Sequence, residues 1–279
     1  MVNRKELNPE SGPRAAYGAR LRNLREGRGW SQEDLAARIE YSSQHISAVE
    51  TGRKPPTLRF SRQADGALGT GGSTETFERQ WREIRHGALL EGFPEYVGCE
   101  GRAVEIRLYE VGVIPGLLQT PEYAGTLAAS DIRRGVVTAD QAQERTSVVA
   151  ERQAALARTP PPLVWAVLDE SCLRRTVGEP DVWDAQLARL MEFAELPNTV
   201  LQIAEFTMGA RRPLSLPLYI LTMADRSLMS YAESAQRGHL ERDGKSVVPI
   251  LSAYHQLQAE ALHQAASVAM ISQLRKGTP

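Results

Sequence analysis

Small polar side chains gather in one short stretch near the N-terminus of this 279-residue chain. Ser43, Gln44 and Ser47 would share the outer face of a helix with Ala48. Side chains this small let a helix enter the major groove of double-stranded DNA, where glutamine can make two hydrogen bonds to adenine. His45 lies in the same stretch. We therefore predict DNA-base contacts from Ser43, Gln44, His45 and Ser47.

Four residues around this stretch could bind DNA phosphates. Gln32 stands at the start of the preceding helix, where its amide and the helix N–H groups can meet a phosphate. Ser42 would cap the outer helix, and Arg53 and Lys54 follow it, where the DNA backbone would flank it. Taken singly, each residue is better explained as a cap, a solvated side chain or a loop charge. Their joint pattern favours DNA binding.

Two short helices must position these side chains. Ser31 and Asp34 have the spacing of a helix-capping box, and the helix that they open would run to Ile39. After a tight turn, a second helix would begin at Ser42 and end at Gly52. Both helices have an apolar inner face, made by Leu35, Ala36 and Ile39 in the first and by Ile46 and Val49 in the second. This arrangement predicts a helix-turn-helix.

Residues 15–68 resemble the helix-turn-helix of the Cro and repressor proteins, the xenobiotic-response-element family. The resemblance is carried by Ser31-Gln32-Glu33, Leu35-Ala36, Ile46, Glu50-Thr51-Gly52 and Arg53-Lys54. It implies that Ser43, Gln44 and Ser47 face bases and that Gln32 touches phosphate. The family usually has glycine in the turn, where this chain has Glu40. Either Glu40 adopts a left-handed conformation or the turn differs.

The distribution of charge agrees with one DNA-binding end. Residues 1–68 hold 12 of the 33 basic and 8 of the 34 acidic residues, which leaves 21 basic and 26 acidic residues for the remainder. The first part is therefore net positive and the rest net negative. This asymmetry is expected when only one end of a protein meets phosphate.

Breaks in the pattern divide the chain into four parts. We expect a flexible arm over residues 1–13, an all-α helix-turn-helix domain over 14–68, a Gly-rich linker over 69–74 and a regulatory domain over 75–279. Alternating and helical patterns in the last part predict an α+β domain, with a small mixed or antiparallel sheet and helices. Its first helix would run from a Thr74 cap to His86.

The C-terminal part resembles the large C-terminal domain of actinobacterial, antitoxin-like transcriptional regulators. Residues 113–124, which read Val-Ile-Pro-Gly-Leu-Leu-Gln-Thr-Pro-Glu-Tyr-Ala, match its signature. The same residues also fit a purely structural role, because Pro-Gly makes a turn and Thr120-Pro121 begins a helix. Further matches are Glu151-Arg152-Gln153, Leu168-Asp169-Glu170, Leu173-Arg174-Arg175, Gln186-Leu187 with Leu190, and Tyr231 with Glu233.

Together these features predict a sequence-specific transcriptional regulator that binds double-stranded DNA as a homodimer on a palindromic operator. The C-terminal domain would sense a small-molecule effector or a small partner protein encoded nearby. The alternative is an antitoxin-like protein that neutralises such a neighbour and autoregulates its operon.

The sequence contains no complete motif of the three enzyme types considered, which are a phosphate-binding loop, a metal-binding helix and a serine nucleophile. Gly244-Lys245-Ser246 lacks the upstream glycine of a phosphate-binding loop, and His255 and His263 lack the spacing of a metal-binding helix. No Gly-x-Ser-x-Gly nucleophile motif is present. We expect no enzymatic activity, cofactor or metal. No apolar run is long enough to span a membrane and the two cysteines fit a reducing compartment, so we expect a cytoplasmic protein.

Overall fold

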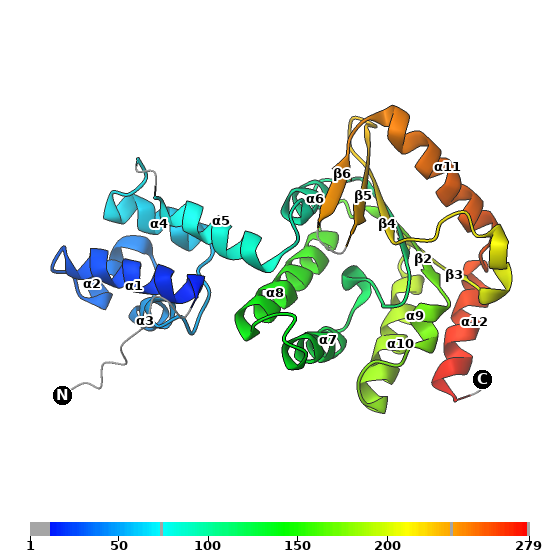
Figure 1. Cartoon of the computed structure of the whole chain (residues 1–279), viewed down its shortest axis with the longest axis horizontal. Coiled ribbons are helices and arrows are strands. Elements are labelled where there is room, and N and C mark those ends of the chain that lie inside the picture. The colour runs from blue at the N-terminus through cyan, green and yellow to red at the C-terminus, as the bar shows by residue number, and fades with distance from the viewer. Residues whose placement is uncertain (1–11, 73–74, 235–236, 278–279) are drawn as a thin grey trace. The chain divides into compact units, whose positions relative to one another are not determined.

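The computed structural model describes residues 12–72, 75–234 and 237–277, and contacts divide the chain into two units that meet between Gly87 and Ala88 (Figure 1). Each unit has its own core. The arm expected over residues 1–13 lies almost wholly outside the described residues, and Pro13 already begins the first helix. Within the described residues, no helix has the length and apolar character needed to cross a membrane.

The first unit is helical throughout its described part, as the sequence predicts. Its helices are α1 (Pro13–Glu26), α2 (Gln32–Ile39), α3 (Ser43–Glu50), α4 (Leu58–Leu68) and α5 (Phe77–Ala88). They enclose one apolar core, which includes the predicted inner faces of α2 and α3 together with Tyr17, Leu21, Phe60, Ala64, Leu68, Phe77 and Ile84.

Helix α5 belongs to this first core. The carboxylate of Asp65 in α4 accepts hydrogen bonds from the backbone N–H of Phe77 (2.7 Å) and Glu78 (2.9 Å), which satisfies the start of α5. The buried ring of Phe77 packs edge-on against Tyr17, with 5.0 Å between centroids. The division between the units therefore falls at the end of α5, whereas glycine content indicated residues 69–74. The expected cap Thr74 lies outside the described residues, and Thr76 caps the N–H of Arg79.

The second unit is built on a mixed six-stranded sheet, in the order β3-β2-β1-β4-β5-β6. The strands β1 (Glu105–Glu110), β2 (Leu163–Asp169) and β3 (Thr199–Ala204) are parallel. The strands β4 (Leu218–Thr222), β5 (Leu228–Glu233) and β6 (Gly238–Glu241) continue the sheet in antiparallel pairing. The predicted α+β class with a mixed sheet is confirmed.

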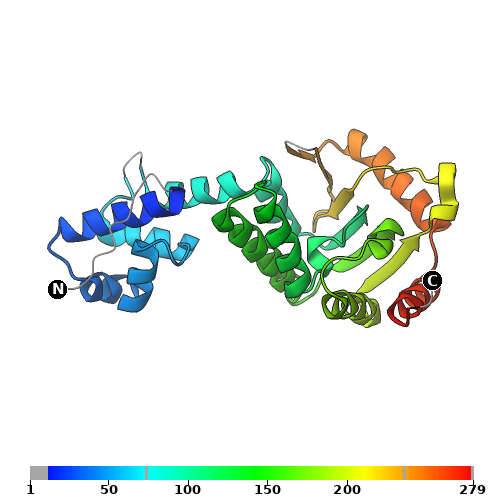
Figure 2. The same ribbon diagram turned by 60° about the horizontal axis from the view of Figure 1, so that its bottom comes forward.

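Helices cover both faces of this sheet. On one side α10 (Pro180–Glu195) and α12 (Gln264–Arg275) lie side by side against β3, seen as the yellow-green and red helices in Figure 2. On the other side α11 (Gly244–Glu260) forms a second core with β1, β2 and β4. The remaining elements are α6 (Phe93–Glu100), α7 (Pro121–Arg133), α8 (Ala139–Leu156), α9 (Ser171–Arg174) and the short 3-10 turns η2 (Gly116–Leu118) and η3 (Phe206–Arg211).

Sequence reasoning did not find α6. Glycine and proline are typical of helix ends, but here Gly92 and Pro94 lie at the start of a helix. Gly92 has a left-handed φ of 87° just before α6, and Pro94 lies in the first turn, where its missing N–H costs nothing. A Cβ on Gly92 would also clash with the carbonyl oxygen of Gly238, at 2.2 Å.

Glutamine side chains hold the segment 114–120, which contains the signature. Gln153 of α8 donates to the carbonyls of Gly116 and Gln119, and Gln186 of α10 accepts from the N–H of Thr120. Within the segment, the Gln119 amide donates to the carbonyl of Ile114 at 2.7 Å. These bonds satisfy a buried non-helical backbone that would otherwise be costly to bury, so much of the signature acts structurally.

The last residue of β1, Glu110, has a buried carboxyl group. Glu110 is 8% exposed, and its oxygens accept hydrogen bonds from the N–H of Val111 (3.1 Å) and the hydroxyl of Tyr219 (3.2 Å). Burial raises the pKa of Glu110 to about 7, and the negative charge of Glu233 adds to the increase. The two hydrogen bonds and Arg152 lower it again, but by less than burial raises it.

This raised pKa makes the stability of the second unit depend on pH. Between about pH 4.5 and 7 the folded state keeps the Glu110 proton and the unfolded state has lost it, so stability falls as the pH rises through this window. We expect the free energy of unfolding of Glu110→Gln, which imitates the neutral form, to exceed that of the wild type by roughly 3 kcal/mol at pH 8 and to match it near pH 4. Urea unfolding at several pH values measures this difference.

Exposed Glu195 at the end of α10 provides the control, because Glu195→Gln changes the same group outside the core. Its unfolding curves should follow the wild type at every pH. A difference between Glu110→Gln and the wild type that stayed constant from pH 4 to 8 would contradict the assignment.

Candidate nucleic-acid interface

The two short helices begin at the predicted caps. The hydroxyl oxygen of Ser31 accepts from the N–H of Asp34 at 3.0 Å, and the Asp34 carboxylate accepts from the Ser31 N–H at 2.8 Å. This is the reciprocal capping box that the spacing predicts. The Ser42 hydroxyl accepts from the N–H of His45 at 3.2 Å and so caps α3. Because Ser42 is exposed, its hydroxyl can also face a phosphate.

The turn between α2 and α3 contains a left-handed residue that is not glycine. Glu40 has φ of 57° and ψ of 44°, which is the first of the two conformations that the sequence left open. A non-glycine residue pays roughly 1–2 kcal/mol for this conformation. The side chain lies at the surface and pairs with Arg59 at 3.5 Å, an exposed contact that compensates little of that cost.

The carboxylate of Glu50 ties the three helices together. It is fully buried at the end of α3 and binds the Arg25 guanidinium of α1 through two hydrogen bonds, at 2.5 and 3.0 Å. Arg22, one turn earlier in α1, approaches the same carboxylate to 3.5 Å. The Gln32 amide, at the start of α2, donates to it at 2.8 Å. The charge on Glu50 is therefore compensated from α1 and oriented from α2.

A glycine lets α1 approach the end of α3. A Cβ added at Gly18 would lie 2.6 Å from the carbonyl oxygens of both Val49 and Glu50. Such distances are below van der Waals contact, so any side chain here would force the two helices apart. The close approach also keeps Arg25, two turns later in α1, within reach of Glu50.

The outer face of α3 carries the predicted base-contacting residues, with the exception of His45. Gln44 is exposed, and Ser43, Ser47 and Ala48 are partly exposed, whereas Ile46 and Val49 point into the core. The helix therefore presents a small polar surface along one side, held by an apolar core along the other. The side chains that form this face in the described part of the chain are small.

His45 takes a packing role. Its ring stacks on Phe60, with 5.4 Å between centroids, and contacts Tyr41 at 4.6 Å. Its Nε2 atom is buried without a hydrogen-bond partner, and its Nδ1 lies 3.3 Å from the Lys54 ammonium. Burial, with the Lys54 charge, lowers the pKa of His45, so the ring is neutral at pH 7. Because Nε2 is buried, Nδ1, which lies beside Lys54 at the surface, is the ring nitrogen left for a base contact, and the base contact of His45 stays a prediction. Helical spacing did not reveal the packing role, because the stacking partner comes from α4.

The predicted phosphate-contacting residues lie at the two ends of the motif. Arg53 and Lys54 are exposed just after α3, and the Arg53 guanidinium is hydrogen-bonded to the hydroxyl of Thr51 at 2.9 Å. Gln32 is partly buried, and its bond to Glu50 fixes the direction of its amide. Sequence reasoning missed the roles of Arg22 and Arg25. Their only signal was helical spacing, which cannot show that both face the carboxylate of Glu50, more than 20 residues further along the chain.

Loss of the Glu50 charge should loosen the whole motif. In Glu50→Gln the amide oxygen can still accept a hydrogen bond from Arg25, but the amide nitrogen cannot accept the bonds that Oε2 receives from Arg25 and Gln32. Arg25 then keeps only the partly exposed carboxylate of Glu26, at 3.4 Å, as a counter-ion among the described residues. We expect this to cost about 3 kcal/mol. Native-state hydrogen exchange of the full chain, read by mass spectrometry, should show amides of α1–α3 exchanging about a hundredfold faster.

The second unit supplies an internal control, because its exchange should not change. Exposed Glu33→Gln in α2 provides the matched control and should exchange like the wild type. If Glu50→Gln protected α1–α3 as well as the wild type does, Glu50 would not be the link between these helices.

Comparison with protein-family models gives one match in the N-terminal part of the chain and one in the C-terminal part. A model described as a helix-turn-helix domain matches residues 16–76, and one described as a domain of unknown function, DUF5753, matches residues 93–273. No curated protein and no solved structure matches the chain. The helix-turn-helix match indicates DNA binding, whereas the second description assigns no role. Since the second match covers more than half of the chain, the protein belongs to the DUF5753 family and carries a helix-turn-helix domain ahead of that domain.

Proposed function

We propose that this protein is a sequence-specific transcriptional regulator that reads an operator with helix α3. The outer face of α3 is the observation that carries the proposal. It presents Ser43, Gln44 and Ser47 on a helix whose opposite side is locked into the core and whose end is fixed by Glu50. A rigid helix with small polar side chains suits direct readout of base edges in the major groove.

Contacts to the DNA backbone would set the register of that helix. Arg53 and Lys54 would meet phosphates on one side of the groove, and Ser42 and Gln32 would meet them on the other. The bond between Gln32 and Glu50 supports this role, because it holds the amide in one orientation before DNA arrives. A preorganised donor loses less side-chain entropy on binding than a free one.

The second unit would regulate this binding. At more than 180 residues it is larger than dimerisation alone requires, and it has its own sheet and two cores. We propose that it contributes dimer contacts and responds to a small molecule or to a partner protein. The antitoxin-like alternative predicts a stable complex with a small neighbouring protein, and no contact in this single chain favours it.

Gln44→Ala should lose sequence preference while keeping general affinity for DNA. Its amide is proposed to pair with a base, so its loss should weaken operator binding by about 1–3 kcal/mol and leave binding to unrelated DNA unchanged. Fluorescence anisotropy on DNA from upstream of the gene and on a scrambled duplex, over a series of salt concentrations, measures both affinities.

Arg53→Gln is the matched comparison. Removing a phosphate contact should weaken binding to both duplexes alike and reduce the slope of log affinity against log salt by about one. Exposed Asn23→Ala in α1 should bind like the wild type. If Gln44→Ala kept full operator preference, α3 would not be the reading helix.

Dimeric binding predicts a dependence on two half-sites. Two recognition helices about one DNA turn apart would contact a palindrome together, so deleting one half-site should lower affinity at least a hundredfold. Analytical ultracentrifugation of the protein–operator complex should give two chains per duplex. Equal affinity for one and two half-sites, with one chain per duplex, would contradict the dimer.

A further inference from the structure

Arg22 of α1 is a partly buried arginine whose hydrogen-bond donors are unused. Its side chain is 22% exposed, and its ion pair joins Nε to the Oε2 atom of Glu50 at 3.5 Å. Within the described residues, the Arg22 guanidinium makes no hydrogen bond. A guanidinium has five N–H donors, and polar groups that are largely buried normally have partners. The donors of Arg22 therefore remain for an acceptor that the described part of the chain does not supply.

The positive charge of Arg22 is only partly compensated. Arg25 already binds both carboxylate oxygens of Glu50, at 2.5 and 3.0 Å, and its Nη1 donates to the carbonyl of Trp30 at 2.7 Å. The carboxylate of Glu26 also lies beside Arg25, at 3.4 Å. The buried carboxylate thus faces two guanidinium groups, and Arg25 makes the hydrogen bonds. Arg22 keeps a weaker attraction over a longer distance, so its charge can also be met by an external anion.

Arg22 lies beside a residue that is predicted to contact DNA. The amide of Gln32 donates to the same Oε2 atom of Glu50 at 2.8 Å, and Arg22 approaches that atom to 3.5 Å. The two side chains come from different helices, α1 and α2, and meet at one oxygen. The amide nitrogen of Gln32 has a second N–H besides the one that Glu50 accepts. Donors of Arg22 and Gln32 can therefore meet the oxygens of one phosphate group.

We propose that Arg22 binds a phosphate of the DNA backbone next to Gln32, as a further phosphate-contacting residue of this interface. Glu50 attracts the Nε side of the guanidinium, and the terminal nitrogens supply the forked pair of donors that phosphate oxygens accept. Such a contact adds to affinity and sets the register of the protein on the duplex, but it does not read sequence. This role rests on the proposed function, because DNA is taken as the source of the phosphate.

Fluorescence anisotropy of the full chain on the upstream duplex and on the scrambled duplex, over a series of salt concentrations, tests the contact. We expect Arg22→Gln to bind both duplexes about tenfold more weakly at low salt and to reduce the slope of log affinity against log salt by about one. The ratio of the two affinities should stay that of the wild type, because a phosphate contact does not read sequence. Arg22→Lys keeps the charge and should keep the wild-type slope.

Native-state hydrogen exchange of the same variant separates a phosphate contact from a structural role. When Arg22 is changed, Glu50 keeps its hydrogen bonds from Arg25 and Gln32. Amides of α1–α3 in Arg22→Gln should therefore exchange within about threefold of the wild-type rate. Glu50→Gln, which loses part of these hydrogen bonds, is the reference for a loosened motif. Weaker DNA binding without faster exchange is the result expected of a residue that touches DNA.

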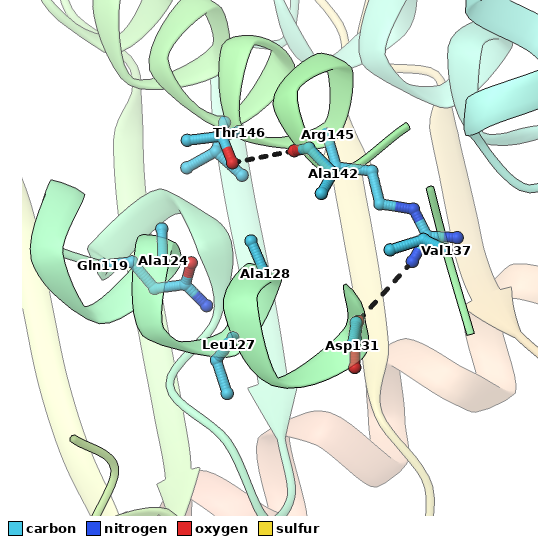
Figure 3. A pocket seen from close by; sticks show the side chains of 10 residues that line it. Gln119, Ala124, Leu127, Ala128, Asp131, Val137, Ala142, Arg145 and Thr146 are labelled. Atoms are coloured by element: carbon cyan, nitrogen blue, oxygen red, sulfur yellow. Dashed lines mark hydrogen bonds and ion pairs between the residues drawn. The ribbon is translucent and has the colours of Figure 1, made fainter. Parts of the chain in front are cut away.

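Two other helical arginines provide matched controls. Arg82 of α5 forms an ion pair with Glu78 of its own helix. Arg145 belongs to the second unit and lies 3.8 Å from Asp131, where both residues line the pocket between α7 and α8 (Figure 3). Arg82→Gln and Arg145→Gln remove the same charge as Arg22→Gln, and both should keep the wild-type salt slope.

The proposal is overturned if Arg22→Gln keeps the wild-type slope, if either control variant lowers the slope as much, or if Arg22→Gln exchanges as fast as Glu50→Gln. Binding of the wild type to the same duplexes tests the proposed function separately. A wild type that binds DNA, beside an Arg22→Gln variant that binds equally well, removes the Arg22 contact alone. A wild type that binds neither duplex removes the proposed function and this contact with it.

Discussion

The DNA-binding unit depends on one buried carboxylate. Removing the charge of Glu50 from water costs several kcal/mol, and this is compensated only if cations and donors meet it with good geometry. Arg25 and Gln32 do so at 2.5–3.0 Å, and Arg22 stands nearby at 3.5 Å. Because these partners come from α1 and α2, their geometry can be satisfied only when the helices surrounding α3 are correctly placed. The orientation of α3 is thus set by electrostatics as well as by apolar packing.

In the second unit, too, buried polar groups are satisfied by partners from other helices. Arg152 of α8 pairs with buried Glu100 of α6, and side-chain amides from Gln153 and Gln186 satisfy the signature segment. Buried polar groups with all partners present favour one arrangement over its competitors, because every alternative leaves some of them unsatisfied. This explains how an irregular segment lies against α8 and α10.

At one position of the helix-turn-helix, the residue present is not the one that its backbone conformation favours. Glycine would suit the turn before α3, and this chain places Glu40 there in a left-handed conformation. The packing of Leu35, Ile39 and Ile46 into a common core holds the turn in that conformation despite its cost. Apolar burial of several side chains outweighs roughly 1–2 kcal/mol of backbone strain.

The sequence by itself determined the helix-turn-helix, its caps at Ser31 and Ser42 and the mixed α+β class, because capping, periodicity and turn chemistry act over a few residues. Tertiary structure alone decided the matters that join distant segments. It stacked His45 on Phe60, which buries its Nε2 atom, and it gave α5 to the first core. It also brought Arg25 to Glu50. Such pairings depend on which surfaces meet after the chain has folded, so residue spacing does not predict them.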